Sequence, residues 1–203
     1  MWSCGLAPGD GPFVAGRELP AARSRPHRVM TPELQALTTP LPSRLRWTRA
    51  HRRTAWLFDG STCVGSLGFG GYGRASGLTS AGVWHLHRRG VLQQGVHLTP
   101  ADGRHPPIVL RQLWGIDGDI DLPGGEGLGW RSLGATGARW GFERRRDHAR
   151  LLTFTADAPL DGDVLVDVSP SAASIADPTP LLLLGAFLVR LAVDDSVVIA
   201  GAV

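Results

Sequence analysis

The chain has 203 residues, 43% of them hydrophobic, which suits one globular domain with a sizeable core and a tail. All 21 basic residues are arginine and the formal net charge is +3. A GC-rich codon bias explains this use of arginine, so no nucleic-acid partner is expected. Two cysteines exclude a disulfide framework. The first residues lack the basic and apolar pattern of a secretory signal, so we expect a cytoplasmic protein.

Residues 1–29 are rich in Gly, Pro and Arg and have no hydrophobic periodicity, which predicts disorder. The alternative is that this stretch is a non-native extension and that the protein begins at Met30. Thr31, Pro32 and Glu33 have the residue types that start a helix, as N-cap, first helical position and first turn. We therefore expect residues 30–42 to form a short helix and a linker ahead of a β domain over 43–203.

From residue 43 onward, short apolar segments alternate with turn residues, a pattern typical of a β-barrel or a β-sandwich. The segments on either side of Arg89 and Gly90 are expected to pair as a hairpin. Residues 74–80 are expected to be a loop. The expected strands cover residues 45–48, 55–58, 61–68, 82–88, 93–98, 108–113, 119–122, 129–133, 139–143, 149–155 and 164–168.

The stretch from Asp177 to Asp195 holds the longest apolar run, and as a helix it is apolar on nearly every side. It is shorter than the roughly 20 residues that a membrane span needs, and Arg190 interrupts it, so no transmembrane span is expected. A flat sandwich would leave one side of this helix exposed, whereas a curled sheet would bury all of it. We therefore predict a mainly β fold, a closed or nearly closed antiparallel barrel of about 10–12 strands. Its central helix would cover about residues 178–193, with 197–200 as a last strand or tail.

A family resemblance rests on the end of the chain and on the strands before it. Ala176-Asp177-Pro178 leads into the apolar helix, which ends at Asp194-Asp195. The expected strands carry spaced tryptophans, namely Trp56, Trp84, Trp114, Trp130 and Trp140. Over about residues 43–195 this pattern resembles the tubby C-terminal-like superfamily, which includes the plant LURP-one-related proteins and the phospholipid scramblases. The resemblance implies a closed barrel threaded by the C-terminal helix, and an association with anionic phospholipids. The chain departs from the family in having no lysine for the tubby Lys/Arg pair and no cysteine cluster of the scramblase type.

Two groups of arginines are candidates for binding anions. If the first strand and the turn after residue 143 meet at one end of the barrel, their guanidinium groups form a patch for lipid headgroups. The alternative is a pair of charged turns that keep the barrel soluble. The candidate residues are Arg44, Arg46, Arg49, Arg52, Arg53, Arg144, Arg145, Arg146 and Arg150.

Three alternating carboxylates form a candidate metal site. Asp117, Asp119 and Asp121 share one side of an extended segment, like the start of a calcium loop. Leu122 and Leu128 stand where an EF-hand needs Gly and Glu, so the full pattern fails. A weak metal site and a solvated turn remain as the two alternatives.

Two further motifs have weaker chemical readings. Residues 68–73 fit G-x-G-x-x-G after a strand, but no helix is expected to follow, so we favour a hairpin loop and expect no cofactor. His85 and His87 share one face of a strand, and a zinc site would need a third ligand. The expected hairpin pairing puts His97 well away from both. We therefore expect outward-facing histidines beside inward-facing Trp84 and Leu86.

No motif marks a catalytic residue. The chain has no G-x-S-x-G sequence, and Cys63 lies in an apolar strand-like run that favours a small buried residue. The sequence therefore favours a non-enzymatic barrel, peripheral at a membrane, that binds anionic phospholipid or a protein partner through its outer surface or rim. The alternative is a ligand-binding or hydrolytic barrel with a rim pocket lined by Trp, His and Asp.

Overall fold

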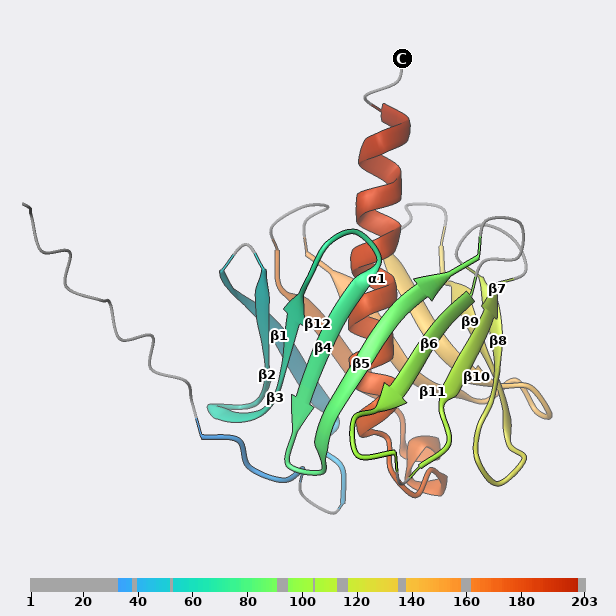
Figure 1. Cartoon of the computed structure of the whole chain (residues 1–203). Helices are drawn as coiled ribbons and strands as arrows, with labels where there is room; N and C mark the ends of the chain where they lie inside the picture. The colour runs from blue at the N-terminus through green and yellow to red at the C-terminus, as the bar shows by residue number, and fades with distance from the viewer. Residues whose placement is uncertain are drawn as a thin grey trace, which may run out of the picture. The chain divides into compact units, whose positions relative to one another are not determined.

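The protein is a closed antiparallel β-barrel with a helix along its axis, as a computed structural model describes it (Figure 1). The structure describes residues 33–37, 40–51, 53–90, 95–103, 105–112, 117–134, 138–157 and 162–200, the last five of them without their side chains. Within this part of the chain, twelve strands form the barrel. The prediction of a mainly β barrel around a hydrophobic C-terminal helix is confirmed.

Each strand pairs with its neighbours in the sequence, and β12 closes the barrel against β1. Odd-numbered strands therefore all run toward one end, here called the upper rim, and even-numbered strands run toward the lower rim. The strands are β1 (Arg44–His51), β2 (Thr54–Asp59), β3 (Thr62–Phe69), β4 (Arg74–Thr79), β5 (Gly82–Arg89), β6 (Gly95–Pro100), β7 (Ile108–Gln112), β8 (Gly118–Asp121), β9 (Gly127–Ser132), β10 (Arg139–Arg144), β11 (Arg150–Ala156) and β12 (Val164–Val168).

The central helix α1 (Thr179–Ala200) begins at the lower rim and leaves the barrel through the upper one (Figure 1). The Asp177 carboxylate accepts a hydrogen bond from the Thr179 backbone N–H at 2.9 Å, which satisfies a donor at the start of the helix. Leu184 is fully buried and Phe187 nearly so, as the enclosed-helix prediction requires. The prediction of a strand or tail over 197–200 is wrong, because the helix continues to Ala200. No glycine or proline lies between Gly185 and Ala200, so the sequence has no helix-breaking residue in this segment.

Strand β4 corrects the prediction of a loop over residues 74–80. Its residues alternate between exposed and buried, and Ala75, Gly77 and Thr79 face the lumen. These inward residues are small because α1 passes close to them. A Cβ atom on Gly77 would lie 2.7 Å from Cδ1 of Leu183. The hydrophobic alternation that identifies a strand is weak here for that reason.

The segment over residues 33–37 is not helical, so this part of the predicted N-terminal helix is wrong. The backbone N–H of Gln35 donates a hydrogen bond to the carbonyl of Cys63 at 2.9 Å, and Leu37 packs against the core. Contact with strand β3 outweighs the local helix signals. Thr31 and Pro32, the expected start of that helix, lie outside the described residues, as do residues 1–29.

Gly185 lies where the helix packs closely against the barrel wall. A Cβ atom at this position would overlap the ring of Phe154 on β11, which is fully buried. An exposed helical Gly→Ala change gains up to about 1 kcal/mol in stability. We expect Gly185→Ala instead to lower the free energy of unfolding by about 1–3 kcal/mol, measured by urea denaturation. Phe154→Leu in the same chain should recover part of that loss. An unchanged or raised stability of Gly185→Ala would contradict the packing described here.

Candidate anion-binding site at the upper rim

The structure does not bring the nine candidate arginines into one patch. Strand β1 runs the height of the barrel, so its start and its end lie at opposite rims. Arg44 lies at the lower rim, because it pairs with Asp167 near the end of β12. The turn that follows β10 lies at the same rim, because the start of β11 also pairs with the end of β12, Leu152 with Val168. Arg49 and Arg53 are near the upper rim, and Arg52 lies outside the described residues. Arg49 and Arg53 therefore do not meet the turn after residue 143 at one end of the barrel, as a single patch would require.

Most of the candidate arginines on the wall and at the lower rim are paired with acids. Arg44 Nε lies 3.1 Å from Asp167, and Arg150 Nη2 lies 2.9 Å from Glu143. Arg46 lies 3.8 Å from Asp163. The turn after β10 is also paired: Arg144 contacts Glu126 and Asp147, Arg145 contacts Asp119 and Asp121, and Arg146 contacts Asp147. Such pairing lowers the positive potential available to an anion.

Arginines also engage the three carboxylates of the candidate metal site. Asp119 accepts a hydrogen bond from Arg131 at 2.6 Å, and Asp121 contacts both Arg111 and Arg145. Asp117 accepts one from the backbone N–H of Ser132 at 2.9 Å. In the described ranges, no group of three or more His, Cys, Asp or Glu side chains is placed to hold a metal ion. A cation at this wall would have to displace guanidinium groups.

An apolar cavity of about 80 Å³ opens at the upper rim between α1 and strands β1, β2 and β12. The alternation of β1 buries Leu45 and Trp47 in the lumen and places Arg49 next on the same face, at the rim. Two guanidinium groups, of Arg49 and of Arg190 on α1, therefore border a mainly apolar cavity. Its lining also includes Trp47, Ala55, Phe69, Ala156, Val164, Ala186, Val189 and Val193.

A second hollow of about 360 Å³ adjoins the cavity and shares Arg49, Phe69 and Arg190 with it. Arg53 and Arg74 also line this hollow. Arg190 is held in place, because its Nε donates a hydrogen bond to Asp194 at 3.0 Å, and its guanidinium lies 6.0 Å from the Phe69 ring centre. The upper rim thus combines an apolar hollow with arginines from strands β1 and β4, from the β1–β2 turn and from the helix.

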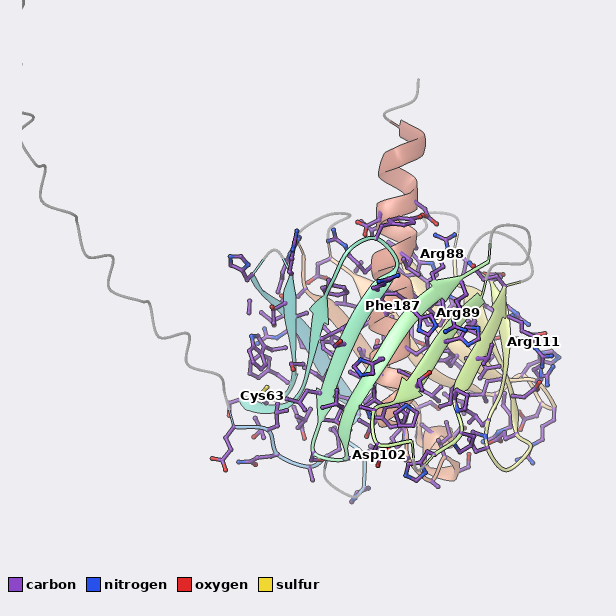
Figure 2. All side chains as sticks on the ribbon, viewed as in Figure 1. Cys63, Arg88, Arg89, Asp102, Arg111 and Phe187 are labelled. Atoms are coloured by element: carbon purple, nitrogen blue, oxygen red, sulfur yellow. The ribbon has the colours of Figure 1, made fainter. Side chains whose placement is uncertain are left out.

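A side-chain cluster ties the loop after β3 to the helix at this rim. Arg88 donates hydrogen bonds to both carboxylate oxygens of Asp195, at 3.1 and 3.2 Å, and to the Tyr72 hydroxyl at 2.8 Å. The Tyr72 hydroxyl in turn donates to Asp195 at 2.5 Å, and this bond is the main reason that the pKa of Tyr72 is raised. Figure 2 shows Arg88 near the upper rim, beside α1.

The structure also decides two further features of the sequence, the glycine motif and Cys63. Residues 68–73 form the end of β3 and a hairpin loop, and strand β4 follows where a dinucleotide site would need a helix. The hairpin-loop prediction is therefore confirmed. Cys63 is buried as predicted, and burial raises the pKa of its thiol. A raised pKa disfavours the reactive thiolate.

The histidines lie on the outer wall as predicted, but their spacing is not the predicted one. His85 and His87 point outward beside the buried Trp84 and Leu86. His97 is directly opposite His87 in the β5–β6 register, with ring centroids 5.3 Å apart. The prediction that His97 is distant is wrong, because the connection between β5 and β6 is longer than the two-residue turn expected at Arg89-Gly90.

Comparisons with protein-family models, with curated proteins and with solved structures find no match to this chain. Among the residues that the structure describes, no helix has both the length and the apolar character needed to cross a membrane. The interpretation of the upper rim therefore depends on its own geometry.

Proposed function

We propose that this protein is a non-enzymatic barrel that binds anionic phospholipid at its upper rim. One observation carries the proposal: a mainly apolar cavity and the hollow beside it are lined by Arg49, Arg53, Arg74 and Arg190. Asp194 is the one acid among the described lining residues, and it pairs with Arg190, so the rim keeps an excess of positive charge. An anionic phospholipid has the matching chemistry, a phosphate beside apolar chains. The resemblance to the tubby C-terminal-like superfamily supports the same class of ligand.

The two parts of the rim would act on different parts of the lipid. A guanidinium group binds phosphate oxygens through paired, charge-assisted hydrogen bonds. The cavity of about 80 Å³ has room for a short apolar segment and not for a whole acyl chain. The protein would therefore stay at the surface of a membrane, with the headgroup at the arginines.

The hydrolytic alternative has less support at this rim. Among the described residues, no histidine lines either hollow, and the Asp194 carboxylate there is paired with Arg190. General acid–base catalysis needs a group that can exchange a proton with a bound substrate. A binding function needs only the charge and the apolar surface already described.

Vesicle flotation tests the proposal. At low salt, we expect the protein to float with vesicles of phosphatidylcholine and phosphatidylserine and not with phosphatidylcholine alone. Replacing Arg49 and Arg190 together by Gln should weaken this binding about tenfold or more, because each basic residue near an anionic surface contributes about 1 kcal/mol.

The matched control removes the same charge from the opposite rim. Arg44→Gln with Arg150→Gln also removes two arginines, and both lie in exposed ion pairs at the lower rim. This control should bind anionic vesicles much like the parent protein. Lipid binding at the upper rim would be rejected if the parent protein floated with neither kind of vesicle. It would also be rejected if the two double variants lost the same amount of binding to anionic vesicles.

A further inference from the structure

A second group of basic side chains lies on the outer wall of the barrel, across strands β4, β5 and β6. The register places Arg74 opposite His87, and His87 opposite His97, in one row. The next row places Ser76 opposite His85. Arg89 follows His87 on the same face of β5 and lies on the outside of the barrel in Figure 2. The fold thus brings five basic side chains from three strands onto one surface.

This surface is hollowed because the neighbouring strand lacks side chains there. Gly68 is opposite Ser76, and the backbone N–H of Gly70 donates a hydrogen bond to the Arg74 carbonyl at 2.9 Å. Gly68 and Gly70 leave a trough of about 640 Å³ beside the basic rows. Its lining includes Arg74, Ser76, His85, His87 and Arg89.

The trough is rich in hydrogen-bond donors that lack acidic partners. Arg74 and Arg89 form no ion pair with any residue that the structure describes. The Ser76 hydroxyl lies 3.4 Å from Nδ1 of His85. Nε2 of His87 is shielded from solvent and has no hydrogen-bond partner among the described groups. The two arginines without acidic partners, beside this histidine, indicate a place for an anion.

We propose that this trough binds a tetrahedral oxyanion, such as a phosphate or sulfate group, and binds it more tightly as His87 becomes protonated. Arg74 on β4 and Arg89 on β5 supply the permanent charge. His87 on β5 adds charge when it becomes protonated.

The sign of the pH dependence follows from the surroundings of His87. Burial lowers the pKa of His87 below the ordinary value of 6.5, and the charges of Arg89, His97, Arg74 and His85 lower it further. The imidazole is therefore mostly neutral at pH 7.5. A bound oxyanion offsets the repulsion among these groups, so it raises the pKa and favours protonation. By linkage, the affinity for the anion rises as the pH falls through this range.

Sulfate is the probe of choice because its charge is constant over this pH range. Binding is followed by histidine NMR signals and by calorimetry at constant ionic strength. We expect sulfate to shift the signals of His87 and His97 and to bind about tenfold more tightly at pH 5.5 than at pH 7.5. A tenfold change corresponds to about 1.4 kcal/mol. At pH 5.5, inorganic phosphate should bind at the same site and shift the same histidine signals.

Three variants separate this site from other surfaces. His87→Gln should remove most of the pH dependence, and Arg89→Gln should weaken sulfate binding at both pH values. His105→Gln, at an exposed residue of the β6–β7 connection, is the matched control and should change neither. Absence of sulfate-induced shifts at His87, or a pH dependence that survives in His87→Gln, would overturn the inference.

Two further measurements test whether the trough and the upper rim are separate binding sites. Arg49→Gln with Arg190→Gln should leave sulfate binding unchanged, and His87→Gln should leave flotation with anionic vesicles unchanged. If His87→Gln abolished vesicle binding and left the sulfate titration unaltered, the free-oxyanion site would be wrong. Failure of vesicle binding alone would reject the rim proposal and not this one.

Discussion

Arg144→Ala is expected to lower the free energy of unfolding by about 1.5–3 kcal/mol, because it removes a buried guanidinium group that makes charge-assisted hydrogen bonds to several groups at the lower rim. The Arg144 side chain is 8% exposed, and its Nε lies 2.8 Å from Glu126 as an ionic contact without hydrogen-bond alignment. Its Nη1 donates to Asp147 at 2.9 Å. Its Nη2 donates to the Ser171 carbonyl at 3.2 Å and to the Ser174 hydroxyl at 2.5 Å.

These contacts explain why one side chain should matter so much. Glu126 belongs to the β8–β9 connection, Asp147 to the β10–β11 turn, and Ser171 and Ser174 to the short helix η1 (Pro170–Ser174). Arg144 therefore joins three connections across the lower rim, beside the start of α1. Ala172 of η1 is fully buried there. Loss of the arginine would loosen the closure of the barrel at this end.

Arg146→Ala is the control for the Arg144 prediction. The Arg146 side chain is 71% exposed, and its contact with Asp147 is 4.0 Å long. Its removal should change stability by less than about 1 kcal/mol, the usual range of an exposed ion pair. Urea denaturation with an unchanged m-value measures both variants. Equal stabilities of Arg144→Ala and Arg146→Ala would show that the lower-rim network does not hold the barrel closed.

The barrel and its helix could be predicted because burial imposes strong patterns. A helix that is apolar on all sides needs a wall around it, and the first half of strand β1 alternates clearly between arginines and apolar residues. Strand β4 was missed because its inner face had to be small beside Leu183. Because close packing against the helix requires small residues on the inner face of β4, this strand lacks the alternation of large apolar and polar residues by which a strand is predicted.

The upper-rim site was predictable only in part. The alternation of β1 places Arg49 on the lumen side, so sequence alone could have separated it from the outward Arg44 and Arg46. The pairing of Arg88 with Asp195 joins residues 107 positions apart and has no local signature. The His87–His97 contact depended on the length of the β5–β6 connection, which sets the register of the two strands.

The central helix should also carry a large share of the stability of the barrel. Leu184 is fully buried on α1, at the centre of a core that extends over all the strands around it. Leu184→Ala should therefore lower the free energy of unfolding by about 2–5 kcal/mol, from lost burial and from the cavity left behind. Urea denaturation measures the change, and the amides of α1 should be among the slowest to exchange hydrogen with solvent.

Leu78 offers the same substitution on the outside of the barrel. It is 41% exposed on β4, opposite Val83, and its side chain faces away from the helix. Leu78→Ala should cost less than about 1 kcal/mol, because little apolar surface returns to water. If Leu184→Ala cost no more than Leu78→Ala, or if the α1 amides exchanged faster than those of the outer strands, the helix could not be the core around which the wall closes.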